Sequence, residues 1–331
     1  MVDPEPCMRR TSVATLVLLL LLSCNLWKEE QHSGLFPVRL DGKVGYIDET
    51  GKLVIDPRFD RAWSFSEGLA LVRVGGNFGY IDKTGKYLIN PQFDEAWSFS
   101  EGLAAARVGG KRGYIDKTGR YVINPQFDDA WSFSGGLANV MIDNRRGFID
   151  KTGKYVINPQ FDNAWSFSEG LAAAQVGGKF GYIDNTGKLV INAQFDDAWD
   201  FSEGLAVVRV VGKYVYIDNS GKYVIDQQFV GAESFSEGLA IIWFGGKRGY
   251  IDKTGRCVMD PQFDDARSLS EGVAVVGVGD NYGYIDNTGK LVIDPQFEYA
   301  CSFSEGLAAV WAGGKLGYID KTGRYVWEPT E

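Results

Sequence analysis

Paired carboxylates are the residues of this sequence that could most readily do chemistry. Asp128-Asp129 and Asp196-Asp197 stand at the same position of a repeating unit. Two carboxylates at a set separation can serve as the acid and base of a glycoside hydrolase, and carboxylate oxygens are ligands for Ca²⁺. However, no calcium-loop motif is present, and an active site is usually singular whereas these pairs recur. We therefore expect no metal, no cofactor and no catalytic residue, with a glycan-active hydrolase as the enzymatic alternative.

The other side chains that commonly carry catalysis are scarce. The chain has one histidine, His32, and four cysteines, Cys7, Cys24, Cys257 and Cys301. A single histidine excludes most triads, general-base schemes and imidazole metal sites. The cysteines show no C-x-x-C spacing, so the sequence predicts neither a zinc site nor a dithiol motif.

Two short motifs suggest phosphate chemistry but fit turns better. Asp-Lys-Thr-Gly recurs with its aspartate at Asp82, Asp116, Asp150, Asp252 and Asp320. It resembles the phosphorylation motif of P-type ATPases, yet its fifth residue is Lys or Arg and no hydrolase domain accompanies it. Gly-Gly-Lys-Arg-Gly at 109–113 lacks the residue order of a phosphate-binding loop and the helix that should follow. We interpret both motifs as hairpin turns.

Charge and composition limit the class of partner. The formal net charge is −9, which argues against nucleic acid, because duplexes and single strands require a basic groove or face. Apolar residues make up 45% of the chain, enough for a core, and the 42 glycines indicate many turns. We therefore expect a protein or glycan partner and no nucleic acid.

The first residues have the features of an export signal. Arg9 and Arg10 precede an apolar run over 13–22 that is too short to span a bilayer. Leu21-Leu22-Ser23-Cys24 resembles a bacterial lipobox, in which Cys24 would become the lipidated first residue. We expect residues 1–23 to be a lipoprotein-like signal peptide, 24–34 a short linker, and the protein to be anchored to a membrane through Cys24. A plain signal peptide, giving a secreted or periplasmic protein, is the alternative, and Met8 is an alternative start.

A strict repeat sets the architecture of the rest of the chain. An aromatic residue followed by Ile-Asp recurs every 34 residues, at Tyr46, Tyr80, Tyr114, Phe148, Tyr182, Tyr216, Tyr250, Tyr284 and Tyr318. A fixed period of this size indicates a solenoid, propeller or array. Short alternating runs of Gly, Tyr, Val and Ile with frequent turn signals exclude helix. We predict an all-β tandem repeat of nine 34-residue antiparallel β-meander units over residues 35–331.

Each unit should fold as a meander. In the second unit, strands are predicted over 68–74, 77–82 and 86–89, joined by a two-residue Gly-Gly turn and a three-residue loop. Pro91 cannot donate a ladder hydrogen bond and ends the third strand. Residues 93–101 carry the chain to the next unit, with a short fourth strand as an option.

The two-residue turn fixes the hairpin register. If Val74 faces Asn77, then Arg73 faces Phe78 on one side of the sheet. The other side carries small and branched apolar residues and suits close packing against a neighbouring unit. A lone three-stranded meander is barely stable, so the units must bury one another's faces.

Stacked units can form an open array or a closed ring. A propeller usually completes one blade from both chain ends. This array begins at a first strand near Val38 and ends at a third strand near Val326, so it needs no such completion. We therefore predict an open solenoid or superhelix, with a closed β-propeller as the alternative.

A tryptophan recurs in the segment between units, at Trp63, Trp97, Trp131, Trp165 and Trp199. In later copies the same position becomes Glu233, Arg267 and Cys301. Because a tryptophan buries a large area and dominates local packing, we interpret the series as structural aromatics between units. A sugar-stacking ladder is the alternative.

Two positions of the unit vary between copies while most positions barely change. They face each other across the hairpin, and Arg and aromatic residues, which stack and hydrogen-bond well, are common at both. Drift on a solvated face is the alternative interpretation. The candidate binding face consists of Arg73, Phe78, Arg107, Arg112, Arg209, Tyr214, Trp243 and Arg248.

Three segments that recur through the array point to a family. They are Gly-Tyr-Ile-Asp-Lys-Thr-Gly-Lys, Val-Ile-Asn-Pro-Gln-Phe-Asp and Phe-Ser-Glu-Gly-Leu-Ala. Together they resemble the bacterial WG-repeat family, also called KWG repeats, over all nine copies. The family's Trp before the Gly is absent here, as at Phe78 and Arg112. The resemblance implies an array of short β repeats, often on exported bacterial proteins, and adds no catalytic residues.

These observations favour a non-enzymatic, extracytoplasmic repeat protein that presents an extended surface to a protein or glycan. A structural spacer without a specific ligand is the second hypothesis. A glycan-active hydrolase is the third.

Overall fold

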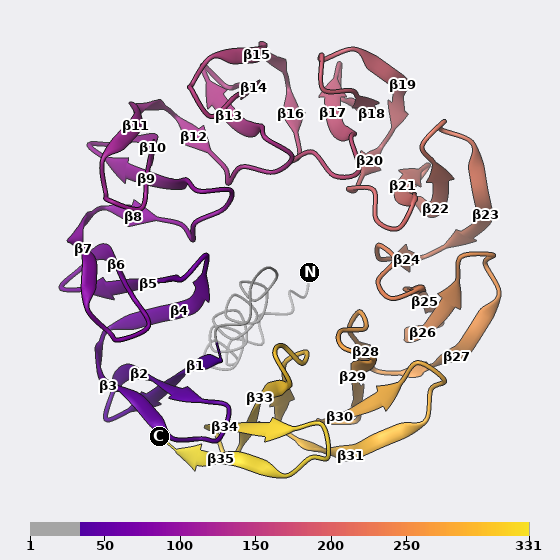
Figure 1. The fold of residues 1–331 in the computed structure, drawn as a ribbon. Helices are drawn as coiled ribbons and strands as arrows, with labels where there is room; N and C mark the ends of the chain where they lie inside the picture. The colour runs from indigo at the N-terminus through magenta and orange to yellow at the C-terminus, as the bar shows by residue number, and fades with distance from the viewer. Residues whose placement is uncertain (1–33, 331) are drawn as a thin grey trace, which may run out of the picture.

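The computed structural model describes residues 34–330, which form a closed ring of antiparallel β-sheets (Figure 1). The ring contains nine sheets, or blades. The first blade has three strands and each of the others has four. Residues 34–330 contain no helix. The prediction of nine all-β units of 34 residues is therefore confirmed.

The strands follow the chain order blade by blade. Blades 1 to 3 contain β1 (Leu35–Leu40), β2 (Lys43–Asp48), β3 (Leu53–Phe59); β4 (Arg61–Ser66), β5 (Leu69–Val74), β6 (Asn77–Ile81), β7 (Tyr87–Phe93); and β8 (Glu95–Ala96), β9 (Ala104–Val108), β10 (Lys111–Ile115), β11 (Tyr121–Phe127). Blades 4 to 6 contain β12 (Asp129–Ala130), β13 (Ala138–Ile142), β14 (Arg145–Ile149), β15 (Tyr155–Phe161); β16 (Asn163–Ala164), β17 (Ala172–Val176), β18 (Lys179–Ile183), β19 (Leu189–Phe195); and β20 (Asp197–Ala198), β21 (Leu205–Val210), β22 (Lys213–Asp218), β23 (Tyr223–Phe229). Blades 7 to 9 contain β24 (Gly231–Ala232), β25 (Leu239–Phe244), β26 (Lys247–Asp252), β27 (Cys257–Phe263); β28 (Asp265–Ala266), β29 (Val273–Val278), β30 (Asn281–Asp286), β31 (Leu291–Phe297); and β32 (Tyr299–Ala300), β33 (Leu307–Ala312), β34 (Lys315–Asp320), β35 (Tyr325–Thr330).

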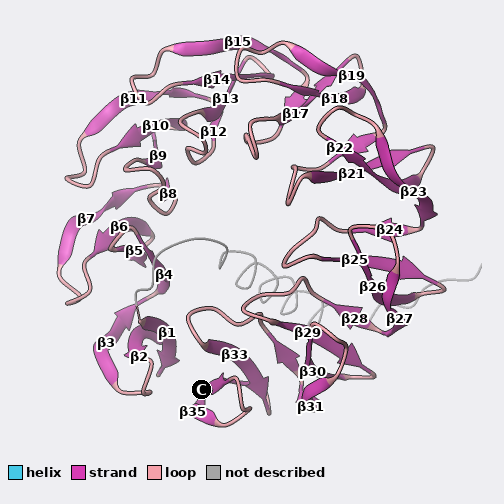
Figure 2. Cartoon of the chain, turned by 45° about the vertical axis from the view of Figure 1, so that its right-hand side comes forward, coloured by secondary structure: helices cyan, strands magenta, loops and turns pink. Residues whose placement is uncertain are grey.

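The last strand of each blade lies at the outer rim of the ring, as β11, β15 and β23 show (Figures 1 and 2). The order of hydrogen-bonded strands in blade 2 is β4-β5-β6-β7, and the later blades repeat it. The first strand of blades 3 to 9 has only two residues and is the fourth strand that the sequence left as an option. This short strand pairs with the next strand of its own blade, as β8 does with β9. Each blade is therefore formed by one continuous stretch of chain.

The register predicted for the hairpin of blade 2 is confirmed. Val74 pairs with Asn77 and Arg73 pairs with Phe78. The outer strand is less regular, because a bulge shifts its pairing with β6 between Phe78 and Tyr80. The bulge brings backbone close to Gly79, whose added Cβ would lie only 2.6 Å from the carbonyl oxygen of Ile89. Glycine in the Gly-Tyr-Ile-Asp motif is therefore required by the close approach of the outer strand.

The core lies between blades and is divided into one cluster for each pair of neighbours. On blade 2, Leu71, Tyr80 and Phe93 are buried against Ala104 and Ala106 of blade 3. Large aromatic residues on one sheet thus meet alanines on the next, which lets the sheets approach closely. The small and branched side of the hairpin packs against its neighbour as predicted.

The buried tyrosine of each motif also ties two segments together by a hydrogen bond. The hydroxyl of Tyr80 donates to the carbonyl oxygen of Trp97 at 2.6 Å, and that of Tyr114 donates to Trp131 at 2.7 Å. Burial raises the pKa of both phenols, so the hydroxyls remain donors at any ordinary pH. In blade 4 the same position is Phe148, which keeps the ring and loses the hydrogen bond.

The ring is closed, and the predicted open solenoid is wrong. Phe36, Val38 and Ile47 of blade 1 share one buried cluster with Tyr299 and Tyr318 of blade 9. The Tyr318 hydroxyl donates to the carbonyl oxygen of Pro37 at 2.8 Å. The N–H of Gly34 also donates to the Glu305 carboxylate at 2.8 Å.

The error came from the assumption that a ring needs a blade shared by both chain ends. Here blade 1 and blade 9 are separate sheets, and no strand crosses from one to the other. The contact between them uses the same kind of side-chain packing that joins every other pair of neighbours. Closure therefore requires no chain exchange, and the absence of a mixed blade does not argue for an open array.

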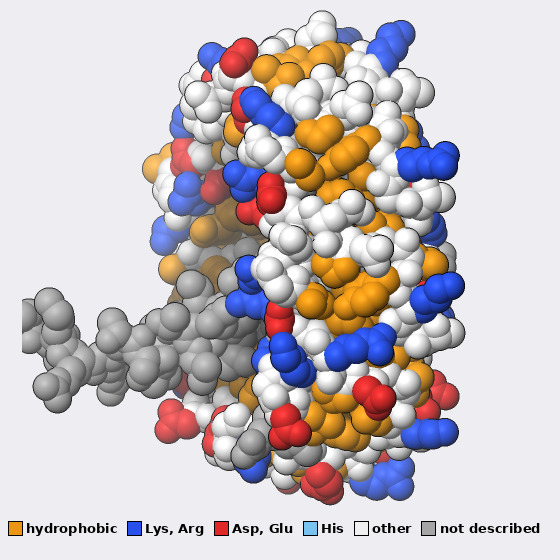
Figure 3. Space-filling view, turned by 90° about the vertical axis from the view of Figure 1, so that its left-hand side faces the viewer, with side chains coloured by type: hydrophobic (Ala, Val, Ile, Leu, Met, Phe, Trp, Pro, Cys, Tyr) orange, Lys and Arg blue, Asp and Glu red, His pale blue; other side chains and the backbone are white. Residues whose placement is uncertain are grey.

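The rim of the ring exposes at least one apolar side chain from the outer strand of each of blades 1 to 8. Val54 is 45% exposed and Leu88 is 49% exposed, and the same position recurs in the later blades. A view of the rim shows separate orange hydrophobic patches, one above another, with other surface between them (Figure 3). Scattered apolar residues of this kind are normal on a soluble surface.

Candidate functional site: the Gly-Gly end of the ring

The variable residues lie near one end of the ring, which we call the Gly-Gly end. It carries a two-residue hairpin turn from each blade, such as Gly75-Gly76 between β5 and β6. Both glycines have positive φ, 59° and 93°, which only glycine adopts without strain. The predicted hairpin turn is confirmed, and the residues on either side of it face each other across two strands.

The structure adds a third residue to each variable pair. The short first strand of a blade pairs with the strand that follows it, so Glu95 lies opposite Arg107, which lies opposite Arg112. This position could not be predicted from the pattern of residues, because a strand of two residues is too short to show a periodicity. The complete triplets of blades 2 to 9 are Arg61, Arg73, Phe78; Glu95, Arg107, Arg112; Asp129, Met141, Arg146; Asn163, Gln175, Phe180; Asp197, Arg209, Tyr214; Gly231, Trp243, Arg248; Asp265, Gly277, Tyr282; and Tyr299, Trp311, Leu316.

The third residue is often acidic, and it neutralises the arginines of the candidate face. Glu95 contacts Arg107 at 2.9 Å and Arg112 at 3.4 Å. Asp197 lies 3.7 Å from Arg209, and Asp265 forms an ion pair with Arg248. The candidate face of arginines and aromatic residues therefore also contains carboxylates, which pair with several of its arginines.

The strongest of these networks joins blades 3 and 4. Asp129 forms ion pairs with Arg112 of blade 3 and with Arg146 of its own blade, the second at 2.6 Å. The side chains of Arg146 and Asp129 are only 11% and 18% exposed. Burial lowers the pKa of both arginines, although both remain charged at any ordinary pH.

Tryptophans and arginines form one layer at this end of the ring. The guanidinium of Arg112 lies 4.2 Å from the ring centre of Trp97, and Arg146 lies 4.9 Å from that of Trp131. Trp131 also stacks on Trp165 of the next blade, with centroids 5.6 Å apart. Such cation–π and stacked contacts stabilise the layer and hold its rings in place.

The tryptophans predicted to be structural are half-buried. Trp63, Trp97, Trp165 and Trp199 each pack against a core cluster between two blades. Each therefore belongs partly to the core and partly to the surface, so packing and contact with a ligand can share one side chain. In blade 8 the position is Arg267, whose guanidinium lies 4.8 Å from the ring centre of Tyr299.

Both carboxylates of the Asp128-Asp129 pair are bound by cationic side chains. Asp128 accepts hydrogen bonds from Lys111 and from the N–H of Asp143, while its neighbour Asp129 is bound by arginines. The Lys111 hydrogen bond lowers the pKa of Asp128. Over residues 34–330, no group of three or more His, Cys, Asp or Glu side chains is arranged to hold a metal.

The Asp-Lys-Thr-Gly motifs cap turns at the opposite end of the ring. One carboxylate oxygen of Asp82 accepts from the N–H and the hydroxyl of Thr84, at 2.9 and 2.6 Å, and from the N–H of Lys86. The Thr84 hydroxyl is the main reason that the pKa of Asp82 is lowered. The carboxylate of Asp82 thus accepts hydrogen bonds within its own turn, as predicted from the sequence.

The predicted export signal cannot be located in the structure. Residues 1–23, Cys24 and most of the predicted linker lie outside the described residues. The part of the chain that is described has no helix with the length and apolar character that a bilayer crossing requires.

A closed ring of radially arranged antiparallel sheets, with one core between each pair of neighbours, defines a β-propeller. The sequence shows which one: the chain belongs to the WG containing repeat family. Matches to the family cover most of the ring, at residues 45–78, 78–111, 113–145, 147–180, 180–214, 216–247, 249–282 and 282–315.

Comparison with solved structures gives matches at low sequence identity. A eukaryotic initiation factor is 13% identical with a TM-score of 0.63, over 89% of this chain and 95% of that one. The extracellular domain of a hybrid two-component system from B. thetaiotaomicron is 13% identical with a TM-score of 0.30, over 91% and 50%. PorZ, a surface component of the type-IX secretion system of Porphyromonas gingivalis, is 10% identical with a TM-score of 0.34, over 91% and 51%. Likeness at these identities shows the fold alone. No curated protein sequence matches the chain.

Proposed function

We propose that this protein is an exported, non-enzymatic propeller that binds a protein or glycan through the Gly-Gly end of its ring. One observation carries the proposal. A layer of Trp, Arg and Tyr side chains lies half-buried at this end, and it varies from blade to blade while the packing positions between blades barely change. A surface that need not interlock with a neighbouring blade is free to diversify toward a ligand.

The chemistry of the layer suits binding. Aromatic rings held by neighbouring side chains lose little entropy on contact with a ligand, and arginine hydrogen-bonds and stacks at the same time. Arg107 and Arg209 keep 38% and 39% of their side-chain surface exposed. Arg73 donates to the carbonyl oxygen of Gly76 in its own turn. These three arginines offer donors to an acidic protein or an anionic glycan, and salt should weaken that binding.

The carboxylates of this end support a binding role over a hydrolytic one. A general acid requires a carboxyl whose pKa is raised toward neutrality. Hydrogen bonds from Lys111 and Lys179 lower the pKa of Asp128 and Asp196 instead. A structural spacer without a ligand is the alternative function, and it predicts that the layer contributes to stability alone.

Replacing Arg73, Arg107 and Arg209 together with serine should weaken binding of the partner by about tenfold or more. Each substitution removes a charge-assisted hydrogen bond that the arginine would donate to the partner. The partner is first captured from cell-surface extracts with the intact protein. Affinity is then measured by biolayer interferometry at low and high salt. Arg248 is left intact, because its side chain is less exposed and also donates to the carbonyl oxygen of Ala266.

The matched control replaces Arg120, Arg256 and Arg324, which are exposed at the opposite end of the ring, and removes the same charge. It should bind as the parent does. If the first triple variant is folded and binds as tightly as the parent, the Gly-Gly end is not the contact surface.

Export and anchoring through Cys24 form the second part of the proposal. A cysteine after a short apolar run is the feature that supports it. Replacing Cys24 with alanine should move the protein from the detergent phase to the aqueous phase in a phase-separation assay. If the variant partitions with detergent as the parent does, the protein is not a lipoprotein anchored at Cys24.

A further inference from the structure

A carboxylate clamp joins neighbouring blades at the end of the ring opposite the Gly-Gly end. The carboxylate of Glu101 accepts the N–H of Gly136 at 3.1 Å and forms an ion pair with Lys151 at 3.0 Å. Glu203, Gly238 and Lys253 repeat the arrangement. Glu169 shows the geometry most fully, because its two oxygens accept two successive N–H groups, those of Glu203 at 2.7 Å and Gly204 at 2.9 Å.

Each clamp is a small anion-binding nest of backbone. Its two residues both have positive φ, for example 56° at Glu203 and 86° at Gly204. This conformation turns successive N–H groups toward one point, where they bind a negative charge. At seven of the nine steps of the ring, the charge comes from a glutamate of the preceding blade, and the position that precedes blade 2 falls at residue 33, outside the described residues. The acceptors are Glu67, Glu101, Glu169, Glu203, Glu237, Glu271 and Glu305.

One step has lost its own carboxylate. Gly135 stands where the glutamate would be, and Asn185 stands where a lysine completes several of the other clamps. The nest itself is intact, since Glu169 and Gly170 have φ of 52° and 82°. Within residues 34–330, the N–H groups of Glu169 and Gly170 make no hydrogen bond, and neither does the side chain of Asn185.

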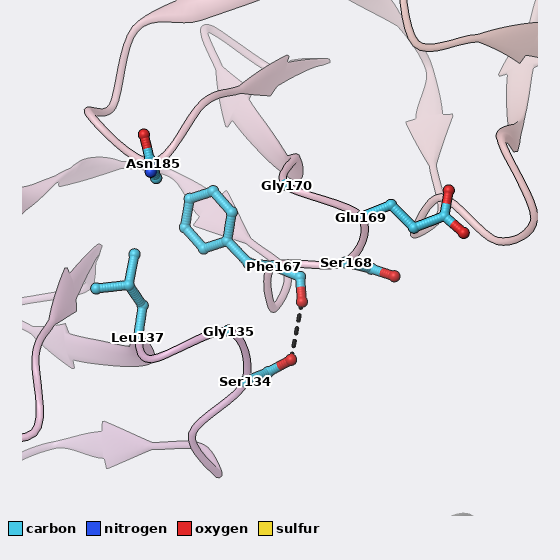
Figure 4. Close-up of a pocket in the computed structure, with 8 residues that line it drawn as sticks. All are labelled: Ser134, Gly135, Leu137, Phe167, Ser168, Glu169, Gly170 and Asn185. Atoms are coloured by element: carbon cyan, nitrogen blue, oxygen red, sulfur yellow. Dashed lines mark hydrogen bonds between the residues drawn. The ribbon is translucent and has the colours of Figure 1, made fainter. Parts of the chain in front are cut away.

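A cavity of about 290 Å³ lies at this step. Phe167 and Leu137 form its apolar wall, and Asn185 lies across from Gly170 (Figure 4). The carboxylate of Glu169 points away from the cavity, toward the nest of the following blade that it occupies (Figure 4). The groups still free to act in the cavity are therefore two backbone N–H donors and the Asn185 amide, which can also donate.

The two serines of the wall do not change this conclusion. The hydroxyl of Ser134 donates to the carbonyl oxygen of Phe167 at 2.9 Å, and that of Ser168 donates to Phe201 at 2.7 Å. Both hydroxyl protons are committed to inter-blade hydrogen bonds. The site thus presents two backbone N–H groups and one amide beside an apolar wall.

We propose that this cavity binds a small organic carboxylate with a short apolar tail. The ligand's carboxylate takes the position that a glutamate side chain fills at most of the other steps, and its tail lies against Phe167 and Leu137. The site is at the end of the ring opposite the proposed partner surface and does not depend on that surface. Its volume is at the lower limit of small-molecule sites, so few contacts form and binding is in the millimolar range.

The test is a titration of the full protein, labelled with ¹⁵N at glycine, with butyrate and separately with neutral butanamide. The amide signal of Gly170, assigned by its loss in Gly170→Ala, should shift and saturate with butyrate and hardly move with butanamide. The amide of Gly204, whose nest already holds Glu169, is the internal reference and should not shift.

Two variants separate ligand binding from local rearrangement. Gly135→Glu restores the glutamate found at most of the other steps; an added Cβ meets only the Cβ of Phe167 at 4.0 Å. It should shift the Gly170 signal without ligand and abolish the response to butyrate. Asn185→Lys adds the missing cation and should tighten butyrate binding about tenfold.

The proposal is overturned if butyrate moves Gly170 no more than butanamide does. It is also overturned if Gly135→Glu responds to butyrate as the parent does, or if Asn185→Lys leaves the affinity unchanged.

Discussion

Replacing Tyr318 with alanine should destabilise the protein by about 3–5 kcal/mol, as truncation of a large buried aromatic residue does. The side chain is 1% exposed and sits in the cluster that joins blade 9 to blade 1. Its ring centre lies 5.7 Å from that of Phe36, and its hydroxyl donates to Pro37. The substitution removes both contacts at the one place where the two ends of the repeat array meet.

Tyr318→Phe separates the ring from the hydroxyl. It keeps the packing and loses one hydrogen bond, which should cost about 1 kcal/mol. Phe148 shows that the fold accepts phenylalanine at this position of the unit. The same two substitutions at Tyr114, which lies between blades 3 and 4, form the matched control. They should lower the free energy of unfolding, measured in urea, by similar amounts.

Hydrogen exchange then distinguishes the two sites. Tyr318→Ala should raise exchange in blades 1 and 9 together, whereas Tyr114→Ala should raise it in blades 3 and 4. If Tyr318→Ala unfolds at the same urea concentration as the parent, the contact between blades 1 and 9 does not hold the ring.

Replacing Asp129 with alanine should cost about 3 kcal/mol, because breaking a buried ion pair leaves its partner charges uncompensated. Two arginines, Arg112 and Arg146, would lose the same carboxylate, and both are largely buried. Arg112 keeps Glu95 at 3.4 Å, while Arg146 keeps only a hydrogen bond to Asn139. The loss should therefore appear mainly in blade 4.

The adjacent residue provides the control for this prediction. Asp128 pairs with Lys111 on the surface, where both side chains are well exposed, and pairs of that kind contribute little. Asp128→Ala should leave the thermal midpoint almost unchanged. Equal destabilisation by the two variants would show that the Asp129 network is no more important to stability than an exposed ion pair.

The regular parts of the blade could be predicted from the sequence, because local chemistry determines them. The Gly75-Gly76 turn fixes which residues pair across the hairpin, so the contact between Arg73 and Phe78 followed from counting residues. The turn aspartates were also predictable, since Asp82 bonds to residues only two and four positions away. Because the period is strictly 34 residues, the structure predicted for one unit could be applied to all nine.

Closure of the ring was not predictable in the same way. It depends on the small angle between each pair of blades, added over the whole array, and no single residue encodes that angle. A signal existed in Glu305 of blade 9, which repeats the clamp glutamate of the other blades. In the structure it binds Gly34 at the start of the array.

The candidate binding face was predicted only in part. The register placed Arg107 and Arg112 opposite each other, but it did not include Glu95, whose strand has two residues. A signal for this position was present in the sequence, because several units that carry arginines at the variable positions also carry an acidic residue at the position of Glu95. Likewise, the joint replacement of the clamp residues by Gly135 and Asn185 was visible in the sequence, but its meaning required knowing that the two positions meet.

Small-angle X-ray scattering of the purified protein distinguishes a closed nine-bladed ring from an open array. A compact chain of this length should give a radius of gyration of about 20 Å. An open array of nine sheets spaced about 10 Å apart would instead extend to about 90 Å. A radius near 20 Å, with the low-angle minimum of a ring in the scattering profile, is the predicted result; a maximum dimension near 90 Å and a rod-like profile would contradict closure.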